Sequence, residues 1–370
     1  MIYISENSIV SAFTSGVSVK KIFTNGIQVW PEETPPVPTS YYIKWLPSSL
    51  SGSFIIGGST YNFEDYSGYF SNFDGTIPAS AFENTGVTRI ETNAINFGSR
   101  AFAGCTSLLA VYLSNCSKIV NEEVFRGCTS LKTVSLPICT SIGSATFRDC
   151  TALSSINLPE VQYISLYGFR DCPELSIVNL PKCRVIGGNA FYISGNINDR
   201  KALSISCPVC ERYQDACFQG RDLIGESKMD FTSCKYIGTR AFYNAIGLYE
   251  SSIKPVYDFP NCSYIGSWAF YNCGFSFMKL SNVTYISDYA FNYDTEHWGW
   301  PETSYSVGYR YISIYTSTVC SLFSSGVFEK FLSGSFVQGA EIYVPSSLYS
   351  EYLSAQYWSD ISTHIHKIAS

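Results

Sequence analysis

The sequence has little charge, little histidine and no clustered cations. Charged residues make up 15% of the 370 residues, histidines number three, and the formal net charge is −6. A surface that binds nucleic acid needs grouped lysines and arginines to release counterions from phosphates, and such runs do not occur. We therefore expect no nucleic-acid partner.

The motifs of common enzymes are also missing. The sequence contains neither a GxxxxGK[ST] loop nor a GxGxxG fingerprint. Two of the three histidines, His364 and His366, lie in the C-terminal tail, so a catalytic Ser-His-Asp or Cys-His constellation is hard to assemble. We expect a non-enzyme with no catalytic residue, no cofactor and no bound metal.

Long apolar runs are absent too. No window approaches 18 consecutive apolar residues, and the N-terminal stretch lacks a basic region followed by an unbroken apolar core. We expect no membrane insertion and no cleaved signal peptide.

What the sequence does have is a regular spacing of cysteines. Fourteen cysteines occur, and those at 105, 116, 128, 139 and 150 follow one another at intervals of 11, 12, 11 and 11 residues. This spacing suits neither a zinc site nor a disulfide framework, and it marks a repeat instead. Apolar residues reach 46% and aromatic residues 16%, enough for a continuous interior.

A recurring phenylalanine defines the repeat. It appears ten times, about every 22 residues, a period in the range of leucine-rich repeats. The positions are Phe82, Phe102, Phe125, Phe147, Phe169, Phe191, Phe218, Phe242, Phe270 and Phe291.

Each unit also contains one short strand. In the run from Val134 to Pro137, valine and leucine alternate with serine, which is the period of a strand, and proline ends the strand because it has no N–H to donate. A single coil cannot bury its own apolar side chains, but stacked coils can, with their strands paired in parallel. The ends of the stack then need caps.

The stretch "CTSLKTVSLPICTSIGSATFRDC" resembles the BspA-type leucine-rich repeat, a family found in bacterial and protist surface proteins and in some phage proteins. The likeness is strong over Phe73 to Leu280 and extends from Tyr41 to the C-terminus. It implies a mainly β fold with short helical or irregular segments, built as a right-handed solenoid, and a binding or scaffolding role. The ending from Ile342 to Ile361 resembles the family's terminal unit, with a last strand stopping at Pro345 and Ser346 or Ser347 capping a short helix.

Eleven of the cysteines occupy two positions of the coil. The first position holds Cys105, Cys128, Cys150, Cys172 and Cys273, and the second holds Cys116, Cys139, Cys183, Cys210, Cys234 and Cys262. Because Val161 and Val283 fill the second position in other units, we interpret these cysteines as buried, reduced, small apolar side chains. The pair Cys207 and Cys210 has zinc or redox spacing, but it also fits the repeat positions, so we expect no metal there.

Residues 1–30 do not carry the repeat. Apolar residues flank Asn25-Gly26, which predicts a β-hairpin over Lys21–Trp30 within a small β module. Residues 31–40 form a proline-rich linker, residues 41–340 the solenoid with insertions near 192–202 and 293–311, and residues 341–370 a C-terminal capping unit. The stretch Val19–Pro31 resembles N-terminal modules of virion proteins from phages that infect gut bacteria of the Bacteroides type, which implies a docking role for its residues: Lys21, Phe23, Asn25, Gly26 and Trp30.

Two surfaces are candidates for ligand binding. The first is the 293–311 insertion, whose residue types favour contacts, although its tryptophans could instead cover the edge of the stack: His297, Trp298, Trp300, Tyr305 and Tyr309. The second is the row of outward strand positions, which could bind glycan hydroxyls or a peptide, or be a plain solvated face: Glu91, Tyr112, Ser135, Asn157, Asn179, Ser206, Asp230, Asp258, Lys279 and Tyr343.

Three functional hypotheses remain open. The first is a phage virion protein, of the tail, a fibre or the capsid surface, assembled in the host cytoplasm, whose N-terminal module contacts other virion proteins and whose solenoid recognises a host-surface glycan or protein. The second is a bacterial or protist adhesin at the cell surface, and the third is an intracellular scaffold. The sequence does not fix the oligomeric state, and a homo-oligomer is compatible with each hypothesis.

Overall fold

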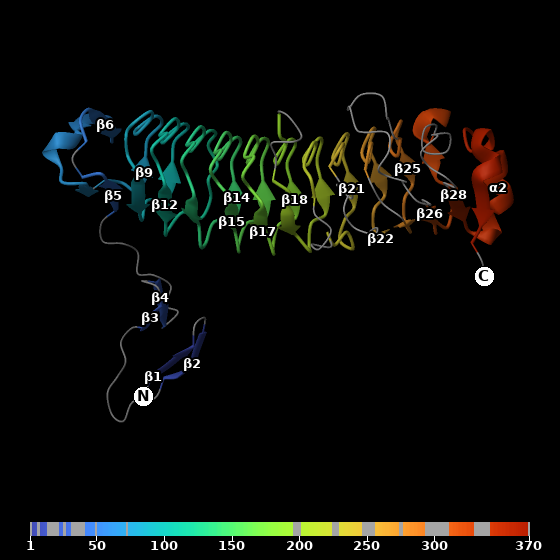
Figure 1. The fold of residues 1–370 in the computed structure, drawn as a ribbon, viewed down its shortest axis with the longest axis horizontal. Coiled ribbons are helices and arrows are strands. Elements are labelled where there is room, and N and C mark those ends of the chain that lie inside the picture. The colour runs from blue at the N-terminus through green and yellow to red at the C-terminus, as the bar shows by residue number, and fades with distance from the viewer. Residues whose placement is uncertain are drawn as a thin grey trace. The chain divides into compact units, whose positions relative to one another are not determined.

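The computed structural model separates the chain into two compact units, Met1–Ser40 and Tyr41–Ser370 (Figure 1). The structure describes the backbone of residues 2–5, 8–12, 22–24 and 27–30, and residues 41–48, 50–71, 73–194, 201–223, 229–245, 256–273, 277–292, 311–328 and 341–368.

The N-terminal unit contains two antiparallel strand pairs. Strands β1 (Ile2–Ser5) and β2 (Ser8–Ala12) form one pair, and β3 (Ile22–Thr24) and β4 (Ile27–Trp30) form the other. The second pair lies within the stretch predicted as a hairpin.

The second unit begins with an antiparallel cap that the sequence did not reveal. Strand β5 (Tyr42–Leu46) pairs antiparallel with β8 (Tyr69–Ser71), and β6 (Ser53–Ile56) pairs with β7 (Ser59–Asn62), which leads into the 3-10 helix η1 (Phe63–Asp65). The Phe54 ring stacks on Phe82, 5.2 Å between centroids, and buried Trp45 packs beside both. Aromatic side chains therefore cover the apolar end of the first coil.

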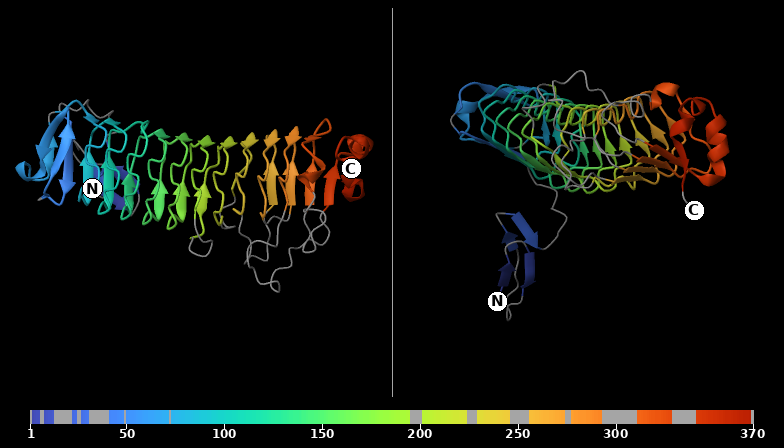
Figure 2. Two further views of the ribbon diagram at one scale, coloured as in Figure 1. Left: turned by 90° about the horizontal axis from the view of Figure 1, so that it is seen from above. Right: turned by 45° about the vertical axis from the view of Figure 1, so that its right-hand side comes forward.

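Stacked coils follow the cap, and most of them contribute a strand to a wall that we call the long-strand wall (Figure 2). Among the described residues, the strands of neighbouring coils that pair in this wall are parallel and in register. Its strands are β10 (Arg89–Thr92), β12 (Ala110–Leu113), β13 (Thr133–Ser135), β15 (Ser155–Asn157), β17 (Ile177–Asn179), β19 (Ser204–Ser206), β22 (Val256–Phe259), β24 (Phe277–Leu280), β26 (Tyr311–Ile314), β28 (Glu341–Val344) and β29 (Ile365–Lys367).

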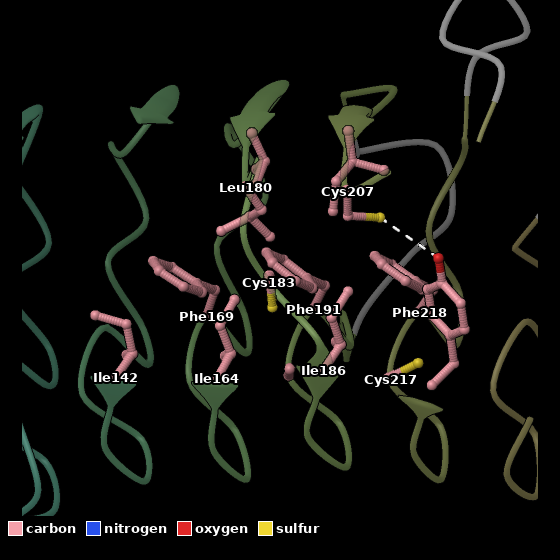
Figure 3. Close-up of a cluster of buried hydrophobic side chains, with 14 of the residues drawn as sticks. Ile142, Ile164, Phe169, Leu180, Cys183, Ile186, Phe191, Cys207, Cys217 and Phe218 are labelled. Atoms are coloured by element: carbon pink, nitrogen blue, oxygen red, sulfur yellow. Dashed lines mark hydrogen bonds between the residues drawn. The ribbon is translucent and has the colours of Figure 1, made fainter. Parts of the chain in front are cut away.

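Two-residue strands form a second wall, the short-strand wall, across the core from the first (Figure 3). In its eight-stranded parallel sheet the second residue of each strand is buried, as Ile142 and Ile164 are. The strands of this wall are β9 (Thr76–Ile77), β11 (Asn96–Phe97), β14 (Ser141–Ile142), β16 (Tyr163–Ile164), β18 (Val185–Ile186), β20 (Arg212–Tyr213), β21 (Tyr236–Ile237), β23 (Tyr264–Ile265), β25 (Tyr285–Ile286) and β27 (Ser321–Leu322).

The recurring phenylalanines stack into one column inside the walls. Phe147 and Phe169 lie 5.3 Å apart with planes 12° from parallel, and both are fully buried. The column runs unbroken from Phe82 to Phe291 and continues to Phe328, which the repeat alignment did not include. The prediction of a mainly β solenoid with few helices is confirmed.

The C-terminal end is closed by short helices: η3 (Ser325–Val327), η4 (Ser346–Leu348), α2 (Tyr349–Ser354) and η5 (Ser359–His364). Trp358 packs on Phe328, and its indole N–H donates to the carbonyl of Cys320 at 2.7 Å. The predicted capping serine was wrong: the Ser346 hydroxyl donates to the carbonyl of Ile368, and Pro345 precedes η4 without a side-chain cap. Strand β28 ends at Val344, directly before Pro345, as expected. It is not the last strand, because β29 follows it and pairs with it.

Candidate functional site

The outward side chains of the long-strand wall form the row that the repeat predicts. In the strand register Glu91 lies beside Tyr112 and Tyr112 beside Ser135, while Asn157, Asn179 and Ser206 follow one another in the same way. Further along, the order is Asp258, Lys279, Ser313, Tyr343 and His366, and Ser313 is the buried member of this series. The alignment missed Ser313 and His366 because insertions obscure the period there.

Asp230 lies outside any strand, so the strand expected there is wrong. Its carboxylate accepts a hydrogen bond from the backbone N–H of Thr232 at 2.8 Å, and short polar side chains that bond to their own backbone in this way compete with strand pairing. Asp230 is exposed, and the next residue, Phe231, is buried and stacks on Phe259. No strand register includes Asp230, so its place in the row stays a prediction.

Charged and aromatic groups gather at the N-terminal end of the row. Lys44 pairs with Glu91 at 3.2 Å, and the Arg89 guanidinium lies over the Tyr112 ring at 4.5 Å. Burial and the nearby Glu91 carboxylate raise the pKa of Tyr42. This end of the wall presents cations and phenol rings together.

The C-terminal end has a different cluster. Lys279 lies 3.8 Å from Asp258, and the Tyr343 ring contacts both Tyr311 and His366. His366 Nε2 lies 2.6 Å from a carboxylate oxygen of Glu341. In the sequence, His366 was assigned only to a tail, and its strand position brings it onto the wall.

The other predicted contact residues fall outside the described residues. His297, Trp298, Trp300, Tyr305 and Tyr309 all lie within the stretch 293–310. Of the proposed docking residues, Lys21, Asn25 and Gly26 lie outside as well, and for Phe23 and Trp30 the structure describes only the backbone strands. In the 192–202 insertion, Ser194 is tied to the Asp171 carboxylate by its backbone N–H and its hydroxyl.

All fourteen cysteines are buried and unpaired, as predicted. The interpretation of the cysteines as small apolar side chains was incomplete, because the thiols at the first position also donate hydrogen bonds to the phenylalanine carbonyl of the preceding coil. Cys128 reaches the Phe102 carbonyl at 3.2 Å, and Cys150 reaches that of Phe125 at 3.3 Å. The same bond recurs at Cys105, Cys172 and Cys273.

An arginine takes over this position in one coil. Arg221 follows Phe218 by three residues, as Cys150 follows Phe147, and it is fully buried. Its guanidinium donates to the carbonyls of Phe191, Leu175 and Cys172 at 3.0, 3.1 and 2.8 Å. Phe191 directly precedes the 192–202 insertion, and Leu175 and Cys172 lie in the coil before it, so the arginine satisfies acceptors next to an interrupted coil.

Cys207 and Cys210 are both buried in the core, as the repeat frame predicts. Figure 3 shows Cys207 among the buried side chains. The Cys207 thiol lies 3.5 Å from the Tyr213 hydroxyl, and burial raises the pKa of Cys207 to about 11. Burial likewise raises the pKa of Cys183 to about 12. A thiol must ionise to act as a nucleophile, so these sulfurs are protonated and unreactive at neutral pH. Within the described part of the chain no group of three or more His, Cys, Asp or Glu could hold a metal ion.

Stacked coils, a phenylalanine column and two parallel walls define a solenoid repeat protein. A family model described as the BspA type leucine rich repeat region, in six copies, matches residues 75–198 and 204–316. The chain belongs to this family. No helix among the described residues is both long and apolar enough to span a bilayer.

Solved leucine-rich repeat structures are similar at low identity. A Treponema pallidum protein, TpLRR, is 22% identical with a TM-score of 0.30; the match covers 44% of this chain and 62% of that one. A Bacteroides ovatus protein is 16% identical with a TM-score of 0.36, covering 75% and 88%. A leucine rich cell surface protein of Faecalibacterium prausnitzii is 16% identical with a TM-score of 0.28, covering 80% and 88%. No curated protein matches the chain significantly.

Proposed function

We propose that this chain is a non-enzymatic virion protein of a phage, in which the N-terminal unit docks onto the particle and the solenoid recognises the host surface. Leucine-rich repeat solenoids are typically non-enzymatic. The observation that carries the recognition role is the in-register row of the long-strand wall, which sets polar and aromatic side chains at a repeat of about 4.8 Å. Such a surface suits an extended ligand rather than a small molecule in a cavity.

The buried thiols support assembly in a reducing compartment. Fourteen cysteines remain unpaired, and thiols persist where glutathione and thioredoxin keep them reduced, as in a host cytoplasm. A virion protein folds there before the host lyses. An exported adhesin would fold its thiols in an oxidising environment.

The division of the chain supports a separate docking function. Residues 1–40 form a compact unit of their own, apart from residues 41–370. Because the coil stack carries its own aromatic caps at both ends, it has no need of the first unit to cover its core. The first unit is thus available for contact with other virion proteins.

The test is a phage that encodes the chain without residues 1–40. We expect the shortened protein to show the same circular dichroism and melting temperature as the solenoid in the full chain and to be absent from purified particles. Its incorporation at the full level would contradict the docking role, and recovery of the intact chain only in the bacterial envelope would favour the adhesin.

The 293–311 segment is a second candidate for host contact, proposed from its residue types alone. A W298A/W300A chain measures its contribution in a binding assay with whole host cells. A loss of binding assigns recognition to this segment, and unchanged binding assigns it to the long-strand wall.

A further inference from the structure

The middle of the long-strand wall differs chemically from both ends. Strands β13, β15, β17 and β19 lie on four consecutive coils, and their outward side chains are five hydroxyls, two amides and one isoleucine. We call this set the neutral window: Thr133, Ser135, Ser155, Asn157, Ile177, Asn179, Ser204 and Ser206.

Charges on these coils lie beyond the strand ends, and most are paired among themselves. Lys182 pairs with Glu160 at 2.7 Å, and Lys201 pairs with Glu174 at 2.7 Å, while Lys132 precedes β13. A charged ligand laid on the window would lose water without meeting an opposite charge, which costs free energy. A neutral ligand avoids this cost.

The amides of the window are held in place and keep bonding capacity. Asn179 Nδ2 donates to Asn157 Oδ1 at 2.8 Å, which fixes both side chains. Among the described residues no further hydrogen bond uses Asn157 Nδ2 or Asn179 Oδ1, so one donor and one acceptor group face outward side by side. Serine and threonine hydroxyls can also both donate and accept hydrogen bonds. Sugar hydroxyls need this mixture of donors and acceptors.

The spacing and apolar content of the window suit a sugar chain. Neighbouring coils are about 4.8 Å apart, close to the length of one sugar ring in an extended chain. Ile177 is 58% exposed between the polar groups and can contact the C–H face of a ring. The Trp, Tyr and Arg anchors of protein interfaces are not among the window's eight described side chains, and they lie instead at the flanks, as Arg89 and Tyr112 do.

We propose that the neutral window binds a neutral linear polysaccharide that runs along the stacked coils with about one sugar per coil. This inference rests on the recognition function proposed above and names the ligand of that surface.

Affinity gel electrophoresis of the full chain tests the proposal, with neutral glucans, mannans and galactans and, separately, a polyuronate in the gel. We expect at least one neutral polysaccharide to retard the chain and the polyuronate to have no effect. The N157A/N179A variant should bind the neutral polymer at least tenfold more weakly. Q162A/Q214A, which removes two amides at the opposite wall, is the matched control and should bind as the parent does.

Three results would overturn the proposal: no retardation by any neutral polysaccharide, stronger retardation by the polyuronate, or unchanged binding by N157A/N179A. Melting temperatures of both variants check that the coils remain folded. Binding of whole host cells separates this inference from the proposed function. If N157A/N179A binds host cells as well as the parent does, the neutral window is not the binding surface, but the recognition function stands. If the parent chain binds no host cells, both the window and the recognition function are contradicted.

Discussion

The first coils of the solenoid are regular, and the later ones are interrupted. From Phe102 to Phe191 the repeat is 22 or 23 residues long, and the position three residues after phenylalanine is cysteine in four successive coils. From Phe191 onward the intervals vary between 21 and 37 residues, and that position holds Ser194, Arg221, Ala245 and Cys273. The phenylalanine stacking nevertheless stays within 5.2 to 5.8 Å from Phe102 to Phe328.

The difference shows which parts of the repeat the fold requires. Ring stacking continues across every insertion, so a coil can change length without leaving the column. A side chain three residues after the phenylalanine can donate a hydrogen bond to the phenylalanine carbonyl of the preceding coil. A thiol provides this donor at Cys150, and a guanidinium provides it at Arg221. From coil to coil, these contacts thus vary less than the residues that make them.

Alkaline pH should have the largest effect, because it acts on regular and interrupted coils alike. Burial raises the pKa of Cys207 to about 11 and of Cys183 to about 12, from an ordinary value of 9.0. These thiols ionise at a lower pH in the unfolded chain than in the folded one. Their contribution to stability is therefore complete below pH 9 and is lost as the pH rises toward their pKa values in the folded chain. Urea midpoints should fall steadily from pH 9 to pH 11. A flat profile would contradict the buried, protonated thiols.

Removing one ring from the column should cost nearly the same in both regions. Phe147→Ala and Phe242→Ala each leave a cavity in a fully buried stack, and we expect each to lower the free energy of unfolding by about 3–5 kcal/mol. Urea denaturation of residues 41–370 measures both. A cost under about 1 kcal/mol at Phe242 alone would show that the interrupted coils repack.

Arg221→Met should affect only the interrupted region. It removes this donor from the carbonyls of Phe191 and Leu175 and one of two donors from that of Cys172, and we expect a loss of about 2–4 kcal/mol in unfolding free energy. Arg126→Met is the control, because Arg126 forms its ion pairs at a partly exposed site and its loss should cost at most about 1 kcal/mol. Equal costs for the two variants would disprove the carbonyl-satisfying role.

The smallest effect should come from the thiol donors. Cys150→Ala removes a weak donor and some volume, with an expected cost of about 1–2 kcal/mol, whereas Cys150→Ser keeps a donor to the Phe125 carbonyl and should cost less. Differential scanning calorimetry of the two variants compares them directly. If serine is the more damaging substitution, packing rather than hydrogen bonding selects cysteine at this position.

The sequence predicted those features that follow from the period. The Phe147–Phe169 stack and the register of Asn157 with Asn179 depend only on equal spacing, which can be counted in the sequence. The cap formed by Trp45 and Phe54 was missed because it carries no repeat, and the strand expected at Asp230 is absent because the Asp230 carboxylate bonds to its own backbone. Arg221 had a signal that could have been read, since it occupies the cysteine position three residues after Phe218.

In the regular coils from Phe102 to Phe191, the described ring stacks and strand pairs join each coil to its two neighbours, and this has a consequence for the size of the molecule. A copied unit such as residues 128–149 would enter the stack between coils that already match it and would lengthen the solenoid by about 4.8 Å. Reach is therefore set by how many times one segment of the gene is duplicated, and surface side chains on each copy can diverge afterwards without altering the shared interior.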